Sequence, residues 1–208
     1  MTFVRILLIF LLSLTAPLTL ASQPSILVMG DSLSAGYGIS LEQGWVHLLQ
    51  QELAKKQQAK IINASVSGET TGGGLTRLPA LLTKHNPDIV IIELGGNDGL
   101  RGQPLNIVRD NLQAMITASQ AAGADVLLAG MQIPTNYGAR YTKQFKETYP
   151  KLAEQNKIKL IPFLLENVAG KSELIQRDGI HPTAEAQPII LKNVLPILLP
   201  MLEGTRKK

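Results

Sequence analysis

Short apolar runs alternate along the chain with longer stretches in which apolar residues recur every three or four positions. The short runs lie at 26–29, 61–62, 89–94, 126–129 and 158–161, and only Glu93 and Lys159 interrupt them. Continuous apolar runs suit strands that are buried on both faces of a parallel sheet. The longer stretches have the spacing of amphipathic helices, and they lie near 45–53, 75–82, 105–116, 141–145 and 184–194.

This alternation predicts an α/β fold in which helices cover both faces of a five-stranded parallel sheet. Right-handed crossovers leave few strand orders open, and we expect the common order 2-1-3-4-5, numbered along the chain. The first strand then lies between the second and the third, so the loops that follow these three strands meet. Open α/β sheets bind their ligands at this carboxyl edge. We therefore expect the functional site there.

Glycine and proline add three local predictions. The run Gly72-Gly73-Gly74 predicts a mobile loop ahead of a helix. Pro150 predicts a break in the helix before it, because proline lacks the N–H that a helix interior requires. For the same reason, Pro196 predicts a kink or an end in the last helix.

The first 21 residues have the pattern of a secretory signal peptide. Arg5 precedes the apolar run 6–14, and Thr19-Leu20-Ala21 offers the small residues that a signal peptidase requires. We expect cleavage after Ala21 and a periplasmic or secreted mature chain. An uncleaved membrane anchor is the alternative, although the apolar run is short for a spanning helix. The remainder, 22–208, has the length of one domain with a substantial core.

The charge and the absence of cysteine narrow the class of protein. A formal net charge of +4 over 208 residues is a mild excess, and it predicts no nucleic-acid partner. The terminal run Arg206-Lys207-Lys208 has the character of a solvated end. Since the chain has no Cys, it forms no disulfide and carries no lipid on a cysteine. Its stability in an oxidising compartment must come from its core. Nothing in the sequence indicates an oligomeric state.

Ser32 follows the first apolar run, in the segment Gly30-Asp31-Ser32-Leu33. Gly30 permits backbone angles that are closed to other residues, and Asp31 favours hydrogen bonds to the nearby backbone, so we expect a sharp turn. A small hydroxyl at the end of a strand is either a helix N-cap or a nucleophile. The sequence around Ser32 leaves both interpretations open.

One of the three histidines has the surroundings of a general base. His181 lies in the turn-rich segment Asp178-Gly179-Ile180-His181-Pro182, whereas His47 and His85 lie in helical stretches. Asp178 can fold back onto one imidazole nitrogen and leave the other free to accept a proton from a serine. Paired with Ser32, this segment predicts nucleophilic catalysis.

Two further residues could donate hydrogen bonds to an oxyanion. Gly68 follows the second predicted strand and offers a backbone N–H, and Asn97 follows Gly95-Gly96 at the end of the third strand and offers a side-chain amide. Asn in such a turn is also a common turn former. Because both loops are expected beside Ser32, we interpret them as candidate oxyanion donors.

These segments together resemble the four successive blocks of the SGNH (GDSL) hydrolases, and most of all the bacterial acyl-CoA thioesterase I, lysophospholipase and arylesterase branch. The resemblance covers the chain after the leader. It rests on Gly30-Asp31-Ser32-Leu33-Ser34, on Gly68 in 63–70, on Gly95-Gly96-Asn97-Asp98 within 93–102, on Asp178-Gly179-Ile180-His181-Pro182, and on 77–82 and 136–138.

The resemblance implies a flavodoxin-like three-layer fold and a serine esterase, thioesterase or lysophospholipase. It implies Ser32 as nucleophile, His181 as base and Asp178 as its orienting partner, with no cofactor and no metal. The oxyanion hole would consist of the Ser32 N–H, the Gly68 N–H and the Asn97 side chain. The substrate would be a small acyl ester or thioester, and we expect its acyl chain between 72–78 and 133–138.

Two alternatives come from other classes of protein. A metal-dependent hydrolase would use Asp31, Asp98, Asp178 and His181 as ligands. A flavodoxin-like binding module without catalysis would need a phosphate-binding loop after the first strand. Asp31 in that loop has the wrong charge for a phosphate.

Overall fold

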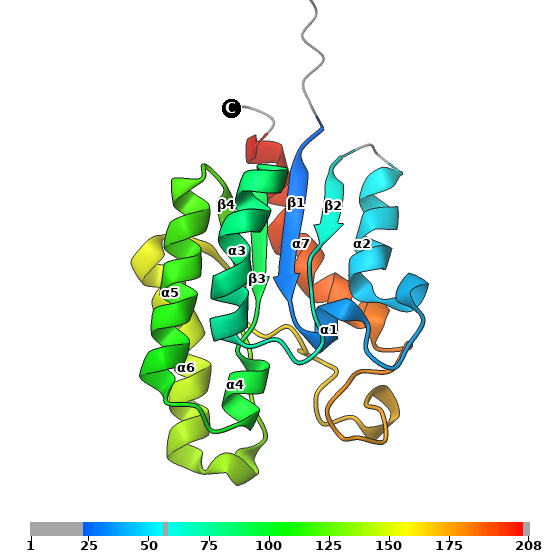
Figure 1. Cartoon of the computed structure of the whole chain (residues 1–208). Coiled ribbons are helices and arrows are strands. Elements are labelled where there is room, and N and C mark those ends of the chain that lie inside the picture. The colour runs from blue at the N-terminus through cyan, green and yellow to red at the C-terminus, as the bar shows by residue number, and fades with distance from the viewer. Residues whose placement is uncertain (1–22, 56–57, 206–208) are drawn as a thin grey trace, which may run out of the picture.

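Five parallel strands form one sheet at the centre of the molecule (Figure 1). The computed structural model describes residues 23–55 and 58–205, so the predicted signal peptide lies outside the described residues. The order across the sheet is β2-β1-β3-β4-β5, which confirms the predicted order. The strands are β1 (Ser25–Gly30), β2 (Lys60–Asn63), β3 (Ile89–Glu93), β4 (Asp125–Ala129) and β5 (Lys159–Ile161).

Helices cover the two faces of the sheet. On one face α3 (Thr71–His85) packs beside α5 (Leu105–Ala121), which packs beside α6 (Ala139–Asn156); on the other, α2 (Trp45–Ala54) packs beside α7 (Gln187–Thr205). Two short helices, α1 (Ser32–Ala35) and α4 (Gly96–Leu100), follow β1 and β3 at the carboxyl edge (Figure 1). Three 3₁₀ turns complete the described elements, at Leu41–Gln43, Thr135–Tyr137 and Ser172–Leu174.

The central strands are buried on both faces, as their continuous apolar runs predict. Residues 26–29 of β1 and 89–92 of β3 have no exposed surface. The two strands pair from Ile26↔Ile89 to Gly30↔Glu93. This register places the end of β1, where Ser32 follows, directly beside the end of β3.

Helix α7 is long and apolar enough to cross a membrane by length and composition alone. In the folded domain, however, Ile190, Val194 and Leu198 of this helix are fully buried in the hydrophobic core. The helix also contacts α2 and β5. One side of helix α7 therefore packs into the core of the α/β domain, while most of the helix is only partly buried.

The predicted mobile loop at Gly72-Gly73-Gly74 is wrong, because all three glycines lie in the first turn of α3. Thr70 is the N-cap of this helix, and its side chain accepts a hydrogen bond from Gly73 N. A Cβ at Gly74 would overlap the Leu94 side chain. Glycine therefore lets α3 approach the sheet closely, which is a packing role that composition alone did not show.

The break predicted at Pro150 is also wrong, and α7 does not end at Pro196, whereas the kink predicted there stays a prediction. Helix α6 continues through Pro150 to Asn156, and α7 continues through Pro196 and Pro200. Each of these prolines faces solvent. A carbonyl that loses its partner to proline can be hydrated there, so the helix continues at a reduced cost.

Candidate active site

The nucleophile candidate sits in a tight turn between β1 and α1. Asp31 is the N-cap of α1, and its Oδ1 accepts a hydrogen bond from Leu33 N at 2.9 Å. Ser32 is therefore the first residue of the helix, so the N-cap interpretation of Ser32 is wrong. A Cβ at Gly30 would lie 2.7 Å from both the Glu93 carboxylate and the Ser34 side chain. Only glycine permits this close approach of the turn to β3.

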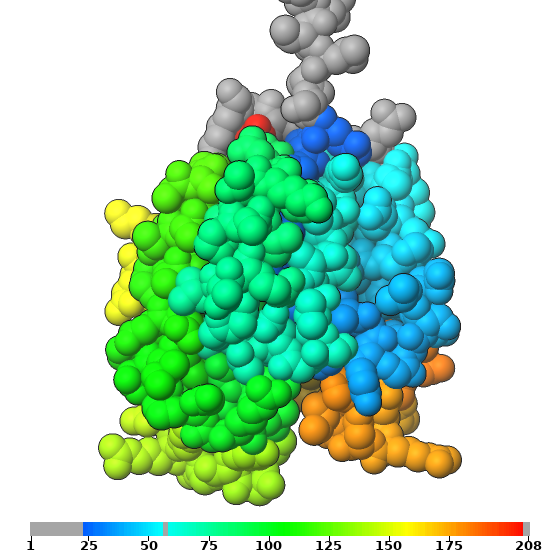
Figure 2. All heavy atoms as spheres, viewed as in Figure 1, coloured from blue at the N-terminus to red at the C-terminus, as the bar shows by residue number. Residues whose placement is uncertain are grey.

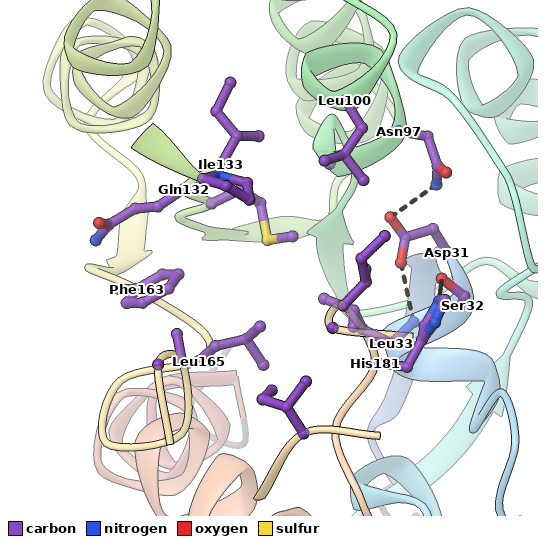
Figure 3. A pocket seen from close by; sticks show the side chains of 18 of the residues that line it. Asp31, Ser32, Leu33, Asn97, Leu100, Gln132, Ile133, Phe163, Leu165 and His181 are labelled. Carbon is purple, nitrogen blue, oxygen red and sulfur yellow. Dashed lines mark hydrogen bonds between the residues drawn. The ribbon is translucent and has the colours of Figure 1, made fainter. Parts of the chain in front are cut away.

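The structure brings Ser32, His181 and Asp178 into one hydrogen-bonded series. Ser32 Oγ lies 2.9 Å from His181 Nε2, and His181 Nδ1 lies 2.6 Å from Asp178 Oδ2 (Figure 3 shows the Ser32–His181 pair). Ser32 and His181 are 149 positions apart in the sequence. They meet because β1 ends in the centre of the sheet and the loop before α7 returns to the same edge.

Asp178 is fixed by the backbone of its own turn. Its Oδ1 accepts hydrogen bonds from Ile180 N at 2.9 Å and His181 N at 3.0 Å. These backbone N–H groups, together with the hydrogen bond and the charge of the His181 side chain, lower the pKa of Asp178 to about 2. The carboxylate is therefore ionised throughout the neutral range, and it favours a proton on His181 Nδ1. Nε2 is then free to accept one.

Two residues that the sequence did not single out hold the His181 loop in place. Gln176 Nε2 donates to the backbone oxygens of Tyr37 and Pro182, both at 2.9 Å. The Tyr37 ring packs against the His181 ring with centroids 4.4 Å apart. The segment around 170–180 consequently lies beside the loop after α1 at the lower edge of the molecule (Figures 1 and 2). Neither residue belongs to a periodic pattern or a motif used in the sequence analysis.

The three candidate oxyanion donors lie around this turn. Within the described chain, nothing accepts a hydrogen bond from the backbone N–H of Ser32 or Gly68. Asn97, in the first turn of α4, donates from Nδ2 to Asp31 Oδ2 at 3.2 Å and to Glu69 O at 2.9 Å. The bond to Glu69 O brings the backbone beside Gly68 next to the Asn97 amide.

Two buried carboxyl groups adjoin Ser32, one on Asp31 within the nucleophile turn and one on Glu93 at the end of β3. Glu93 Oε2 accepts from Asp31 N at 3.2 Å and from Ser34 Oγ at 2.6 Å, and Glu93 has no exposed surface. Burial raises the pKa of Glu93 well above its usual range, and the nearby Asp31 raises it further. Burial also raises the pKa of Asp31 to about 6. The sequence predicted Asp31 as a turn former or, in the alternative, a metal ligand, and it assigned no role to Glu93.

An apolar cavity of about 500 Å³ opens beside Ser32, His181 and Asn97 (Figure 3). The segments 131–135 and 163–180 contribute most of its wall. Its apolar side chains are those of Leu33, Leu100, Met131, Ile133, Pro134, Phe163, Leu165, Ala169, Ile175 and Ile180. Of the two segments expected beside the acyl chain, 133–138 contributes residues 133–135 to the cavity wall. None of residues 72–78, which lie in α3, lines this cavity.

The four side chains of the metal-site alternative are not assembled into one cluster. Asp98 accepts from Thr71 N at 2.9 Å and from Thr71 Oγ1 at 2.6 Å, whereas Asp178 is engaged by its own turn and His181. Over residues 23–55 and 58–205, no group of three or more His, Cys, Asp or Glu side chains is placed to hold a metal ion.

A serine at the end of a central strand, with histidine and a carboxylate in series behind it, is the arrangement of a serine hydrolase. The model of the GDSL-like lipase/acylhydrolase family matches residues 28–188. The chain belongs to this family, which confirms the resemblance seen in the sequence.

Characterised relatives extend over most of the chain. Esterase TesA of Pseudomonas aeruginosa is 50% identical over 88% of this chain and 91% of its own length. Thioesterase 1/protease 1/lysophospholipase L1 of Escherichia coli is 45% identical over 82% of this chain and 81% of its own. The crystal structure of the psychrotrophic esterase EstA from Pseudoalteromonas, inhibited by monoethylphosphonate, matches with a TM-score of 0.83. It is 44% identical and covers 87% of this chain and all of EstA. The protein is an esterase or thioesterase.

Proposed function

We propose that this protein hydrolyses acyl esters and thioesters through an acyl-enzyme on Ser32, with His181 as general base and acid and Asp178 as its orienting partner. The observation that carries the proposal is the 2.9 Å contact between Ser32 Oγ and His181 Nε2 at the mouth of the apolar cavity. The phosphonate inhibitor of the related esterase EstA supports it, because phosphonates form covalent bonds with activated serines.

The reaction proceeds in two halves. Ser32 Oγ attacks the carbonyl carbon while its proton passes to His181 Nε2. The tetrahedral intermediate collapses when the imidazolium returns that proton to the leaving alcohol or thiol, and the acyl group stays on Ser32. A water molecule, deprotonated by the same Nε2, then attacks the acyl carbon. The fatty acid leaves and Ser32 regains its proton.

The oxyanion of each tetrahedral intermediate is held by the backbone N–H groups of Ser32 and Gly68 and by Asn97 Nδ2. The two backbone groups have no acceptor among the described residues, so they are free for the substrate. Both hydrogens of Asn97 Nδ2 are engaged. An oxyanion competes well for one of them, because charge-assisted hydrogen bonds are roughly twice as strong as neutral ones.

The acyl chain occupies the cavity, whose lining is mostly apolar. Each buried methylene contributes about 0.8 kcal/mol, so kcat/KM should rise by about fourfold per methylene until the cavity is full. The relatives' names include arylesterase, thioesterase and lysophospholipase. We propose substrates of these kinds, whose common part is the acyl group.

We also propose that residues 1–21 direct export of the protein and that they are cleaved off after Ala21.

A fluorophosphonate probe tests the serine mechanism. We expect one probe molecule per chain, on Ser32, and full esterase activity in the presence of EDTA. Loss of activity in EDTA, with no label on Ser32, would favour the metal-dependent alternative.

The intact mass of the labelled protein, purified from the periplasmic fraction, also reports its first residue. Ser22 is expected there, and a mass that includes residues 1–21 would contradict cleavage.

A larger side chain in the cavity should shorten the preferred acyl chain. Leu165 lines the cavity and is half-buried. Leu165→Trp fills part of this space, so we expect kcat/KM for long-chain p-nitrophenyl esters to fall at least tenfold, the equivalent of about two buried methylenes. The value for the acetyl ester should stay within about twofold, because that ester does not reach the cavity wall.

Leu41→Trp is the matched control for this prediction. Leu41 is 71% exposed and lies outside the cavity wall, so the same substitution there should leave the profile unchanged. The measurement is kcat/KM from two to sixteen carbons for both variants. An equal loss at every chain length in Leu165→Trp would place the acyl chain elsewhere.

A further inference from the structure

The carboxyl group of Asp31 contacts both halves of the proposed catalytic centre. Its Oδ1 accepts from Leu33 N at 2.9 Å and so caps the helix that begins with Ser32. Its Oδ2 accepts from Asn97 Nδ2 at 3.2 Å (Figure 3). One side chain therefore connects the nucleophile turn to the oxyanion donor on α4.

This contact determines which end of the Asn97 amide faces the nucleophile turn. An amide has a donating and an accepting end of almost equal size, and the hydrogen-bond partners select between them. An ionised carboxylate only accepts, and the other partner, Glu69 O, is a carbonyl that also only accepts. Both partners select the NH₂ end, which is the end that an oxyanion requires.

A second carboxyl group holds Asp31 in place from below. Glu93 Oε2 accepts from the Asp31 backbone N–H and from Ser34 Oγ, which are on either side of Ser32 in the turn. Glu93 is the last residue of β3 and pairs in register with Gly30. The rigid end of the central sheet thus fixes the backbone from which the Asp31 side chain extends.

Burying the charged carboxylate of Asp31 lowers the stability of the folded protein, which argues against a role as a helix cap alone. The residue is 2% exposed, and burial raises the pKa of its carboxyl to about 6. Serine and asparagine are equally good N-caps without a charge. A raised carboxyl pKa also means that this group makes the folded state less stable as the pH rises from about 4 through 6.

We propose that Asp31 is a positioning residue for the oxyanion hole, whose carboxylate keeps the NH₂ end of Asn97 directed at the nucleophile turn. This inference rests on the proposed function, because it assigns Asn97 as an oxyanion donor. Asp31 acts through Asn97 and takes no part in bond making. Its loss should therefore lower kcat and leave KM and folding nearly unchanged.

A double-mutant cycle tests this coupling. Asn97→Ala should lower kcat by about 100- to 1,000-fold with little change in KM, because it removes one oxyanion donor. Asp31→Asn keeps an N-cap oxygen for Leu33 but presents an NH₂ group to Asn97, which favours the accepting end of that amide and opposes the selection by Glu69 O. We therefore expect a fall in kcat of about 10- to 100-fold. Asp31→Asn in the Asn97→Ala background should change kcat by less than about twofold.

The readouts separate positioning from a structural role. All rates are expressed per active site, titrated with the fluorophosphonate probe, and the free energy of unfolding is measured by denaturant at pH 7. For Asp31→Asn we expect no loss of that free energy, because the variant removes a costly buried charge. Asp31→Ser, which keeps a cap but is too short to contact Asn97, should show the same deficit in kcat.

Asp88→Asn is the matched control. Asp88 accepts from Ser25 N at 2.7 Å and so contacts β1 at the opposite end of the sheet, and its replacement should leave kcat unchanged. Multiplicative losses in the double mutant, or wild-type kcat in both Asp31 variants while Asn97→Ala is impaired, would overturn this inference alone. Wild-type kcat in Asn97→Ala would overturn both the inference and the proposed oxyanion hole.

Discussion

Ser32→Ala should remove esterase turnover almost completely, by roughly 10⁶-fold in kcat, while the protein remains folded. Among the described residues, the Ser32 hydroxyl has one hydrogen-bond partner, His181 Nε2. Alanine is favourable at the first position of a helix, and the N-cap of α1 is Asp31 rather than Ser32. The substitution therefore removes the nucleophile and leaves the turn intact. The measurement is kcat on p-nitrophenyl esters together with fluorophosphonate labelling.

Ser34→Ala is the matched control for this loss. Ser34 is on the same short helix and is equally buried, but its hydroxyl donates to Glu93 and does not approach His181. We expect Ser34→Ala to retain stoichiometric labelling, with a smaller loss of kcat than Ser32→Ala. Retained ester hydrolysis by folded Ser32→Ala would refute the acyl-enzyme mechanism.

The fold was predictable because its main signals are local. The continuous apolar runs of β1 and β3 are long enough to read without tertiary information, and right-handed crossovers then leave few strand orders. The errors came from residues whose role depends on what packs against them. Gly74 is a packing residue because Leu94 lies opposite, and Pro150 and Pro196 are tolerated because they face solvent. No window of sequence contains that information.

The candidate site was predictable where the functional group of a residue and its position in the chain are enough to suggest a role. Ser32, His181 and Asn97 were found because a hydroxyl, an imidazole and an amide follow strands or turns. Asp31 was read as a turn residue because its second partner, Asn97, is 66 positions away. The wall at 163–180 was missed because its apolar residues lie in loops without period. Such residues acquire a role only when the sheet edge brings them together.

Asp178→Asn separates the orientation of His181 from its basicity. Asparagine retains an oxygen for the backbone N–H groups of Ile180 and His181, so the turn should persist. Its NH₂ group, however, donates toward His181 Nδ1 and favours the tautomer with a proton on Nε2. That tautomer cannot accept the Ser32 proton. In a serine protease with a buried aspartate, the same change costs about 10⁴-fold in kcat.

Here the expected loss is between about 10²- and 10⁴-fold, because solvent reaches this carboxylate. The Asp178 side chain is 37% exposed to solvent, so water can replace part of its effect on the His181 tautomer. His181→Ala removes the base and should lower kcat more than Asp178→Asn does.

Because the pKa of Asp178 is about 2, well below the usual 3.8, the wild-type carboxylate stays charged as the pH falls to 4. Its favourable effect on folding is lost only below that, between pH 4 and 2. The measurement is kcat from pH 4 to 9 for the three proteins. Wild-type kcat in Asp178→Asn across this range would reduce Asp178 to a turn residue, with His181 oriented by Tyr37 and Gln176 instead.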